Sequence, residues 1–114
     1  MELQFSELGN GISLIKLIGV LDVQGVDTIE TKFAGYSTGD QSKVLVDLAE
    51  VEFLTSIGIR LLVTTAKSVA SRGGKFVLLN PNENVKGILE MTGIMDIIPI
   101  HSSLQEAVAD LNAA

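Results

Sequence analysis

The sequence contains no cysteine, and its only histidine is His101. Without cysteine there can be no disulfide, no thiol nucleophile and no cysteine-based zinc site, and one histidine excludes a histidine-rich metal site. No uninterrupted apolar run approaches the roughly 20 residues that a helix needs to cross a membrane. We therefore expect no metal, no cofactor and no insertion into a membrane.

Basic residues are also few, with 8 Lys and Arg against 14 Asp and Glu, a net charge of −6 and a pI of about 4.6. Nucleic-acid phosphates and anionic lipids repel such a chain, so we expect no direct binding to nucleic acid and favour a basic or neutral protein partner. The first residues, Met1–Phe5, lack the basic and apolar regions of a signal peptide. We therefore place the protein in the cytoplasm.

What the sequence does have is enough apolar material for one compact domain, because 46% of its 114 residues are hydrophobic. We expect a single domain over residues 1–114. At its start, apolar and polar residues alternate over Leu3–Phe5, Gly9–Gly11 is a strong turn signal, and Ile12–Ile18 is again typical of a strand. These three stretches predict an N-terminal antiparallel hairpin.

After this hairpin the spacing of apolar residues becomes that of a helix, with Val26, Ile29 and Phe33 on one face. Asp22 is a plausible start for this helix, which we expect to end near Gly35. After a polar loop over residues 39–42, the unbroken apolar run Val44–Val46 predicts a central strand that is buried on both faces.

A second amphipathic helix follows from Ile57 and ends at Gly73-Gly74. Its predicted inner stripe is Ile59, Leu62, Val63, Ala66, Val69 and Ala70. Further on we expect a strand over Lys75–Leu79, a short helix, an edge strand around Ile97–Ile100 and a last helix that Ser102-Ser103 can cap. The inner residues of the two later helices are predicted to be Val85, Ile88, Leu89 and Met91, and Leu104, Ala107, Val108 and Leu111.

This order of elements predicts an α/β fold with a mixed, mostly parallel sheet of about five strands, four helices and an antiparallel first strand. The carboxyl ends of parallel strands gather at one edge of such a sheet, where binding sites form. Ser56 should lie at that edge, at the beginning of the second predicted helix. The positive end of that helix favours an anion such as a phosphate on the hydroxyl.

Ser56 therefore has two interpretations, a phosphoacceptor or a helix cap, and on spacing alone the cap is favoured. Arg60, one turn later, could pair with a phosphate on Ser56 or could simply be solvated. Ile57 and Leu61 lie off the main apolar stripe beside Ser56. They could form a partner-binding patch or could pack under a neighbouring loop.

Other candidates have simpler interpretations. Asp22 can border the same edge of the sheet, although a helix cap is favoured for it, and we expect Asp47 to be solvated or bonded to backbone, without a catalytic role. His101 lacks a nucleophile elbow near Ser56, so we expect it in a loop or at a helix cap. Gly73-Gly74-Lys75 lacks the other residues of a phosphate-binding loop and is interpreted as a helix stop.

Two stretches, Gly19-x-Leu21-Asp22 and residues 46–62, show that the whole chain resembles a STAS domain of the anti-sigma factor antagonist type. In that bacterial family the serine that matches Ser56 is phosphorylated by a cognate anti-sigma factor that is also a serine kinase, and a phosphatase reverses the modification. The resemblance implies partner switching, in which the unmodified protein binds the anti-sigma factor and frees a sigma factor. It implies a kinase substrate and not an enzyme.

Many antagonists have aspartate where this chain has Thr55, and a small residue where it has Ile57, so Thr55 remains the alternative site of modification. We expect partner-binding residues around Ser56, namely Asp22, Thr55, Ile57, Gly58, Arg60 and Leu61. A rival function within the same fold is a STAS adaptor subunit of a lipid-transport or other ABC-type transporter assembly. A small hydrolase or nucleotide-binding enzyme is the second rival, for which the chain has few suitable residues.

Overall fold

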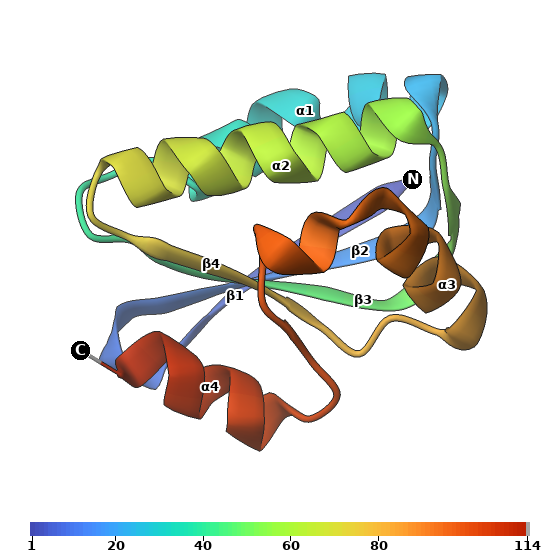
Figure 1. Cartoon of the computed structure of the whole chain (residues 1–114). Coiled ribbons are helices and arrows are strands. Elements are labelled where there is room, and N and C mark those ends of the chain that lie inside the picture. Colours follow the sequence, from blue (N-terminus) through green and yellow to red (C-terminus); the bar gives the residue numbers. More distant parts are fainter. Residues whose placement is uncertain (114) are drawn as a thin grey trace.

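Strands and helices alternate along residues 1–113, the part of the chain that the computed structural model describes (Figure 1). In chain order the elements are β1 (Glu2–Leu8), η1 (Gly9–Gly11), β2 (Ile12–Leu21), α1 (Val23–Tyr36), β3 (Lys43–Leu54), α2 (Ser56–Ser71), β4 (Lys75–Leu79), α3 (Glu83–Thr92), η2 (Ile94–Asp96), β5 (Ile100–His101) and α4 (Leu104–Asn112). The two η elements are single turns of 3-10 helix.

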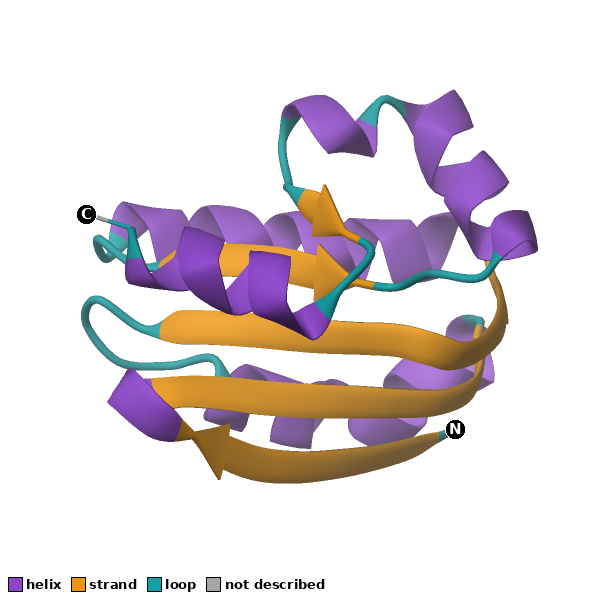
Figure 2. Cartoon of the chain, turned by 90° about the horizontal axis from the view of Figure 1, so that it is seen from below, coloured by secondary structure: helices purple, strands orange, loops and turns teal. Residues whose placement is uncertain are grey.

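The strands form one sheet in the order β1-β2-β3-β4-β5. β1 runs antiparallel to β2, and every other neighbouring pair is parallel. Figure 2 shows the four longer strands side by side, with β1 at one edge. The predicted α/β fold, with a mostly parallel sheet and an antiparallel first strand, is confirmed.

Helices cover both faces of this sheet, with α1 and α2 on one face and α4 on the other (Figure 1). β3 is buried from both sides because its consecutive apolar residues alternate between the two cores. Val44 and Val46 belong to the core under α1 and α2, whereas Leu45 packs in the core that contains Ala107 and Leu111 of α4. All three β3 side chains are fully buried, so the predicted central strand is confirmed.

Side chains cap three of the four α-helices within residues 1–113. The Asp22 carboxylate accepts a hydrogen bond from the Gly25 amide at 2.8 Å, and Asn82 and Ser103 cap α3 and α4 in the same way. Each cap satisfies a backbone N–H that has no partner within its helix and contributes about 1 kcal/mol of stability. The predicted capping roles of Asp22 and Ser103 are confirmed.

Three residues that were predicted on inner helix faces are exposed. Met91 is 89% exposed, because it lies six residues, or roughly one and two-thirds turns, after Val85 and so falls outside the buried stripe of α3. Leu104 is 47% exposed at the start of α4, which slopes away from the sheet there (Figure 1). Ala70 is exposed in the last turn of α2.

The predicted edge strand also begins later than expected, at Ile100, and has two residues. The residues before it continue the turn of η2, because the amides of Ile97 and Ile98 both donate to the Ile94 carbonyl at 2.8 Å. Hydrogen bonds of this local kind compete with strand pairing, so Ile97 lies outside the sheet and is half exposed.

Candidate functional site

The chain passes from β3 into α2 through a single residue, Thr55. Thr55 has an extended backbone, with φ −106° and ψ 179°, and its carbonyl accepts the first helical hydrogen bond from the Ile59 amide at 3.0 Å. Thr55 therefore occupies the N-cap position, and Ser56 is the first residue within the helix. The interpretation of Ser56 as the cap is wrong, because the preceding residue already holds that position.

The hydroxyl groups of Thr55 and Ser56 have different surroundings. The amide of Thr55 donates to the Leu21 carbonyl at 3.2 Å, and its hydroxyl lies 3.5 Å from the same oxygen. Thr55 is half-buried at the end of β2, whereas Ser56 is exposed. Of these two hydroxyl residues, Ser56 is the more exposed to solvent.

The first backbone amides of α2 have no side-chain partner among the described residues. Thr55 makes no side-chain capping bond, and within residues 1–113 no other side chain bonds to the first amides of this helix. The amides of Ser56, Ile57 and Gly58 precede the first helical hydrogen bond, so they leave the positive end of the helix dipole unneutralised. An anion attached to Ser56 would be stabilised there by roughly 0.3–1 kcal/mol.

Two glycines allow the helices to begin very close to the end of β2. A Cβ on Gly58 would lie 2.5 Å from the Leu21 carbonyl oxygen, and a Cβ on Gly25 would lie 2.1 Å from the Val20 carbonyl oxygen. Both glycines are buried. Gly58 thus fixes where the first turn of α2 sits on the sheet, and with it the position of Ser56.

Asp22 reaches the same edge through the register of β2 and β3. Leu21 pairs with Leu54 at the carboxyl ends of these parallel strands, so the next residues, Asp22 and Thr55, leave the sheet side by side. Asp22 is half-buried, and its carboxylate holds the start of α1. The structure therefore brings the starts of α1 and α2 together at the predicted edge.

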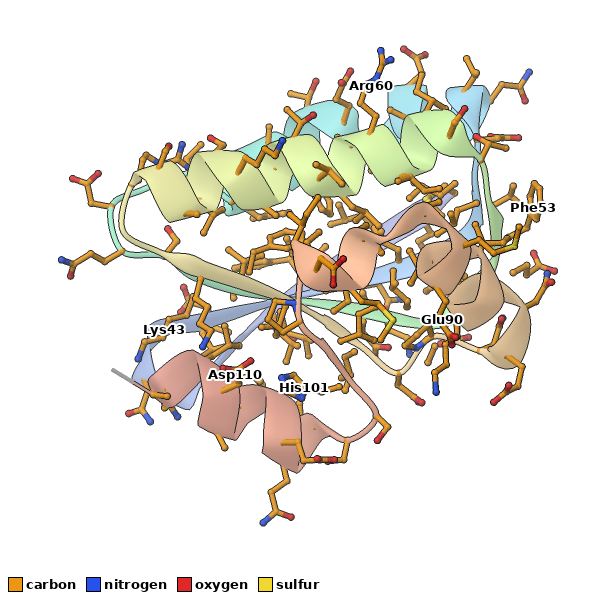
Figure 3. The ribbon with its side chains drawn as sticks, in the orientation of Figure 1. Lys43, Phe53, Arg60, Glu90, His101 and Asp110 are labelled. Atoms are coloured by element: carbon orange, nitrogen blue, oxygen red, sulfur yellow. The ribbon has the colours of Figure 1, made fainter. Side chains whose placement is uncertain are left out.

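Between these two helices lies a groove of about 530 Å³. Its walls come from Val23, Gln24, Val26, Asp27 and Glu30 of α1 and from Ile57, Arg60, Leu61 and Thr64 of α2. Ile57 and Leu61 are half-buried and pack partly against the main core, and the partner-binding patch that they could form stays a prediction. Arg60 is exposed and projects from α2 away from the sheet (Figure 3).

The α1 wall of this groove was missed in the sequence. Nothing in the pattern of Val23, Asp27 and Glu30 indicates that they face α2, because the contact joins segments some 30 residues apart. Phe53 was also missed as a surface residue. It is 44% exposed at the end of β3 (Figure 3), and alternation with the buried Leu54 is the signal that could have placed it outside.

His101 lies on the side of the sheet that α4 covers, beside Asp110 (Figure 3). It is in β5 and not in a loop or cap as predicted, and its Nε2 lies 2.8 Å from an Asp110 carboxylate oxygen. The other Asp110 oxygen accepts a hydrogen bond from Lys75. Lys75 first, and His101 second, hold the pKa of Asp110 below its usual range. This cluster joins α4 to β4 and β5.

Asp47 and the pair Gly73-Gly74 have the structural roles that were predicted for them. The Asp47 carboxylate accepts a hydrogen bond from the Ala49 amide at 2.9 Å. Gly73 and Gly74 lie between the end of α2 and the start of β4, as expected of a helix stop. Among residues 1–113, no group of three or more His, Cys, Asp or Glu side chains could hold a metal ion. None of the helices in that range is long and apolar enough to span a membrane.

Comparisons with known proteins match nearly the whole chain. The STAS domain family matches residues 7–107. A Thermotoga neapolitana protein, named as a candidate anti-sigma factor antagonist, is 36% identical over 70 residues, which are 61% of this chain and 62% of that protein. The chain therefore spans about three fifths of that relative's length. The anti-sigma F factor antagonist of Paenibacillus polymyxa is 25% identical over 113 residues, with 97% of each chain covered.

A solved structure gives the same result. An anti-sigma-factor antagonist (STAS) domain protein from Planctomyces limnophilus superposes with a TM-score of 0.88 at 28% identity. The match covers 97% of this chain and 98% of that one. The sheet, the helices and the β3–α2 junction thus belong to a fold that regulatory proteins of this name share.

Proposed function

This chain belongs to the STAS domain family, as residues 19–22 and 46–62 predicted, and on that premise we propose that it is an anti-sigma factor antagonist controlled by phosphorylation. In its unmodified form it binds an anti-sigma factor that is also a serine kinase, and a sigma factor is released for transcription in the cytoplasm. Phosphorylation breaks this complex, and a serine phosphatase restores it. The protein is the substrate of both enzymes.

The exposure of Ser56 at the start of α2 is the observation that carries this proposal. A kinase must bring the acceptor oxygen into its own active site, and an exposed residue at the edge of the sheet allows that approach. Thr55 is the alternative acceptor. Its hydroxyl lies beside the Leu21 carbonyl, so Thr55 would have to move before it could react.

The proposed contact surface surrounds Ser56. Ile57, Arg60 and Leu61 form it from α2, and Asp22 and Thr55 border it where the strands end. Gly58 contributes indirectly, because it is buried and sets the position of the helix.

Phosphorylation would break such a contact for an electrostatic reason. A phosphoserine adds roughly −1.5 to −2 charges at neutral pH, and a dianion in a tight interface must be paired or it costs several kcal/mol. A loss of about 2.7 kcal/mol already lowers affinity about a hundredfold. One modification is therefore enough to separate the two proteins without unfolding either.

Affinity purification from the native host, followed by mass spectrometry, tests the proposal. We expect a histidine-kinase-like ATPase to copurify and phosphate to appear on Ser56 when that ATPase is present, and to disappear when its gene is deleted. An ABC-transporter ATPase as the copurifying protein, with Ser56 and Thr55 unmodified, would favour the adaptor function instead.

A further inference from the structure

The groove between α1 and α2 begins at Ile57, the residue after Ser56. We propose that it receives an amphipathic segment of the anti-sigma partner, with apolar side chains toward the groove and lysine or arginine toward α1. The inference rests on the proposed function, which makes the start of α2 a docking region. It adds α1 as a second wall and states which chemistry the partner must present.

The apolar part of the groove is open to a partner. Val23 is 65% exposed at the start of α1, and Ile57 and Leu61 are half-buried across from it on α2. Ile57 and Leu61 are four residues apart, so they lie on one face of their helix. Paired stripes of this kind suit the binding of an amphipathic helix, which places apolar residues at similar spacing into the groove.

The charged residues of the groove favour a partner segment that carries positive charge. Asp27 and Glu30, three residues apart on α1, line the groove together with the single guanidinium of Arg60. Within residues 1–113, none of these three side chains forms an ion pair. Two free carboxylates in a protein of net charge −6 attract basic side chains and repel phosphates.

The charge of the groove favours a basic partner segment over a nucleotide as its ligand. A volume of about 530 Å³ falls within the range of small-molecule pockets, so size alone allows either occupant. A nucleotide that paired its phosphates with Arg60, the only cation of the groove lining, would share the groove with the carboxylates of Asp27 and Glu30. A basic amphipathic segment instead gains pairing at the α1 wall and burial over Val23 and Ile57.

Three synthetic helical peptides of about 15 residues test the inference. They share one leucine stripe and carry lysine, glutamine or glutamate on its flank, and each is titrated into the ¹⁵N-labelled unmodified protein. We expect the lysine peptide to bind most tightly and to shift the amide resonances of residues 23–30 and 57–64. The Asp27→Lys, Glu30→Lys double variant should weaken that peptide by about tenfold or more, and Leu61→Gln should also weaken it.

The matched control is Asp40→Lys with Glu90→Lys, which makes the same change in net charge at exposed positions outside the groove. This variant should retain the affinity to within about threefold. Equal losses in both double variants, equal binding of the glutamate peptide, shifts that lie elsewhere or no binding at all would overturn the inference. So would the same shifts produced by GTP, or by raising the concentration of the protein alone, which would indicate a nucleotide or a second copy.

The peptide titrations use neither a kinase nor the phosphorylated protein. A failure of the groove therefore leaves the role of Ser56 intact, and absence of phosphorylation in the host leaves the peptide result intact. The two ideas can fail separately.

Discussion

Ser56 and Thr55 are adjacent hydroxyl residues, and their surroundings decide which one can act as a switch. Ser56 is exposed and has no structural duty as a cap, whereas Thr55 occupies the N-cap position beside Leu21. A substitution at Ser56 should therefore alter binding with little effect on the fold. This separation of roles makes the proposed switch testable with single residues.

We expect Ser56→Asp to weaken binding to the anti-sigma partner by at least about tenfold, because it places a charge in the interface. Ser56→Ala should bind as the unmodified protein does and should resist release by the kinase and ATP. Isothermal titration calorimetry of the purified pair measures both variants. Ser102→Asp is the control, since it adds the same charge at an exposed position outside the proposed contact surface. Equal affinities for the Asp and Ala variants would contradict the switch.

The sequence was sufficient to locate Ser56 but not to describe its surroundings. The apolar run of β3 and the helical period after it place a hydroxyl at a strand-to-helix junction, and this follows from local pattern. Whether Thr55 or Ser56 takes the N-cap position depends on a difference of one residue in where the helix begins. The spacing of apolar residues cannot resolve such a difference. The contact between Thr55 and Leu21 joins two strands and has no local signal.

At the scale of elements, the first turn of α2 is held against the end of β2 by the absence of a side chain at Gly58. We expect Gly58→Ala to lower the free energy of unfolding by about 1–3 kcal/mol, because the new Cβ would lie 2.5 Å from the Leu21 carbonyl oxygen. Gly87→Ala in α3 is the matched control. Its Cβ meets no atom within 4 Å, so alanine there should be neutral or stabilising by up to about 1 kcal/mol. Urea denaturation compares the two, and equal effects would refute the close approach.

The attachment of α4 depends on pH through Asp110. Lys75 and His101 lower the pKa of this carboxyl, so its contribution to stability is present above the ordinary value of about 3.9 and is lost as the pH falls through the lower folded value. Asp110→Asn should therefore be less stable than the natural protein at pH 7, and the difference should shrink below about pH 4. Urea denaturation at several pH values measures it. A difference that is the same at all pH values would show that the ion pairs do not contribute.

Elements with a strong period were predictable, and contacts between elements were not. The apolar run Val44–Val46 predicts a buried strand, and the spacing of apolar residues predicts the α2 helix. The order of the elements along the chain then limits the number of possible sheet topologies. Leu104 shows the limit, because it shares a stripe with Ala107 and Leu111 and yet is exposed where α4 leaves the sheet. The His101–Asp110 pair and the α1 wall of the groove depend on how the elements pack in space.

For the whole molecule, the question is whether a phosphate changes the fold or only its surface. The free amides at the start of α2 already favour an anion, and among the described residues the exposed Ser56 hydroxyl forms no hydrogen bond that a phosphate must break. The Asp22 cap of α1 borders the modified residue, whereas Asn82 and Ser103 cap other helices. The fold should therefore remain the same in both states of the switch.

We expect genetically encoded phosphoserine at position 56 to leave the melting temperature unchanged or slightly raised, within about 1 kcal/mol of stability, with NMR shifts confined to residues near the β3–α2 junction. Phosphoserine at position 71 is the control. Ser71 is the last residue of the same helix, where the dipole is negative, so a phosphate there should lower the stability. If phosphoserine 56 destabilises the protein as phosphoserine 71 does, or shifts resonances across the sheet, then partner release proceeds through a change of conformation. The local charge at the docking surface would not be its cause.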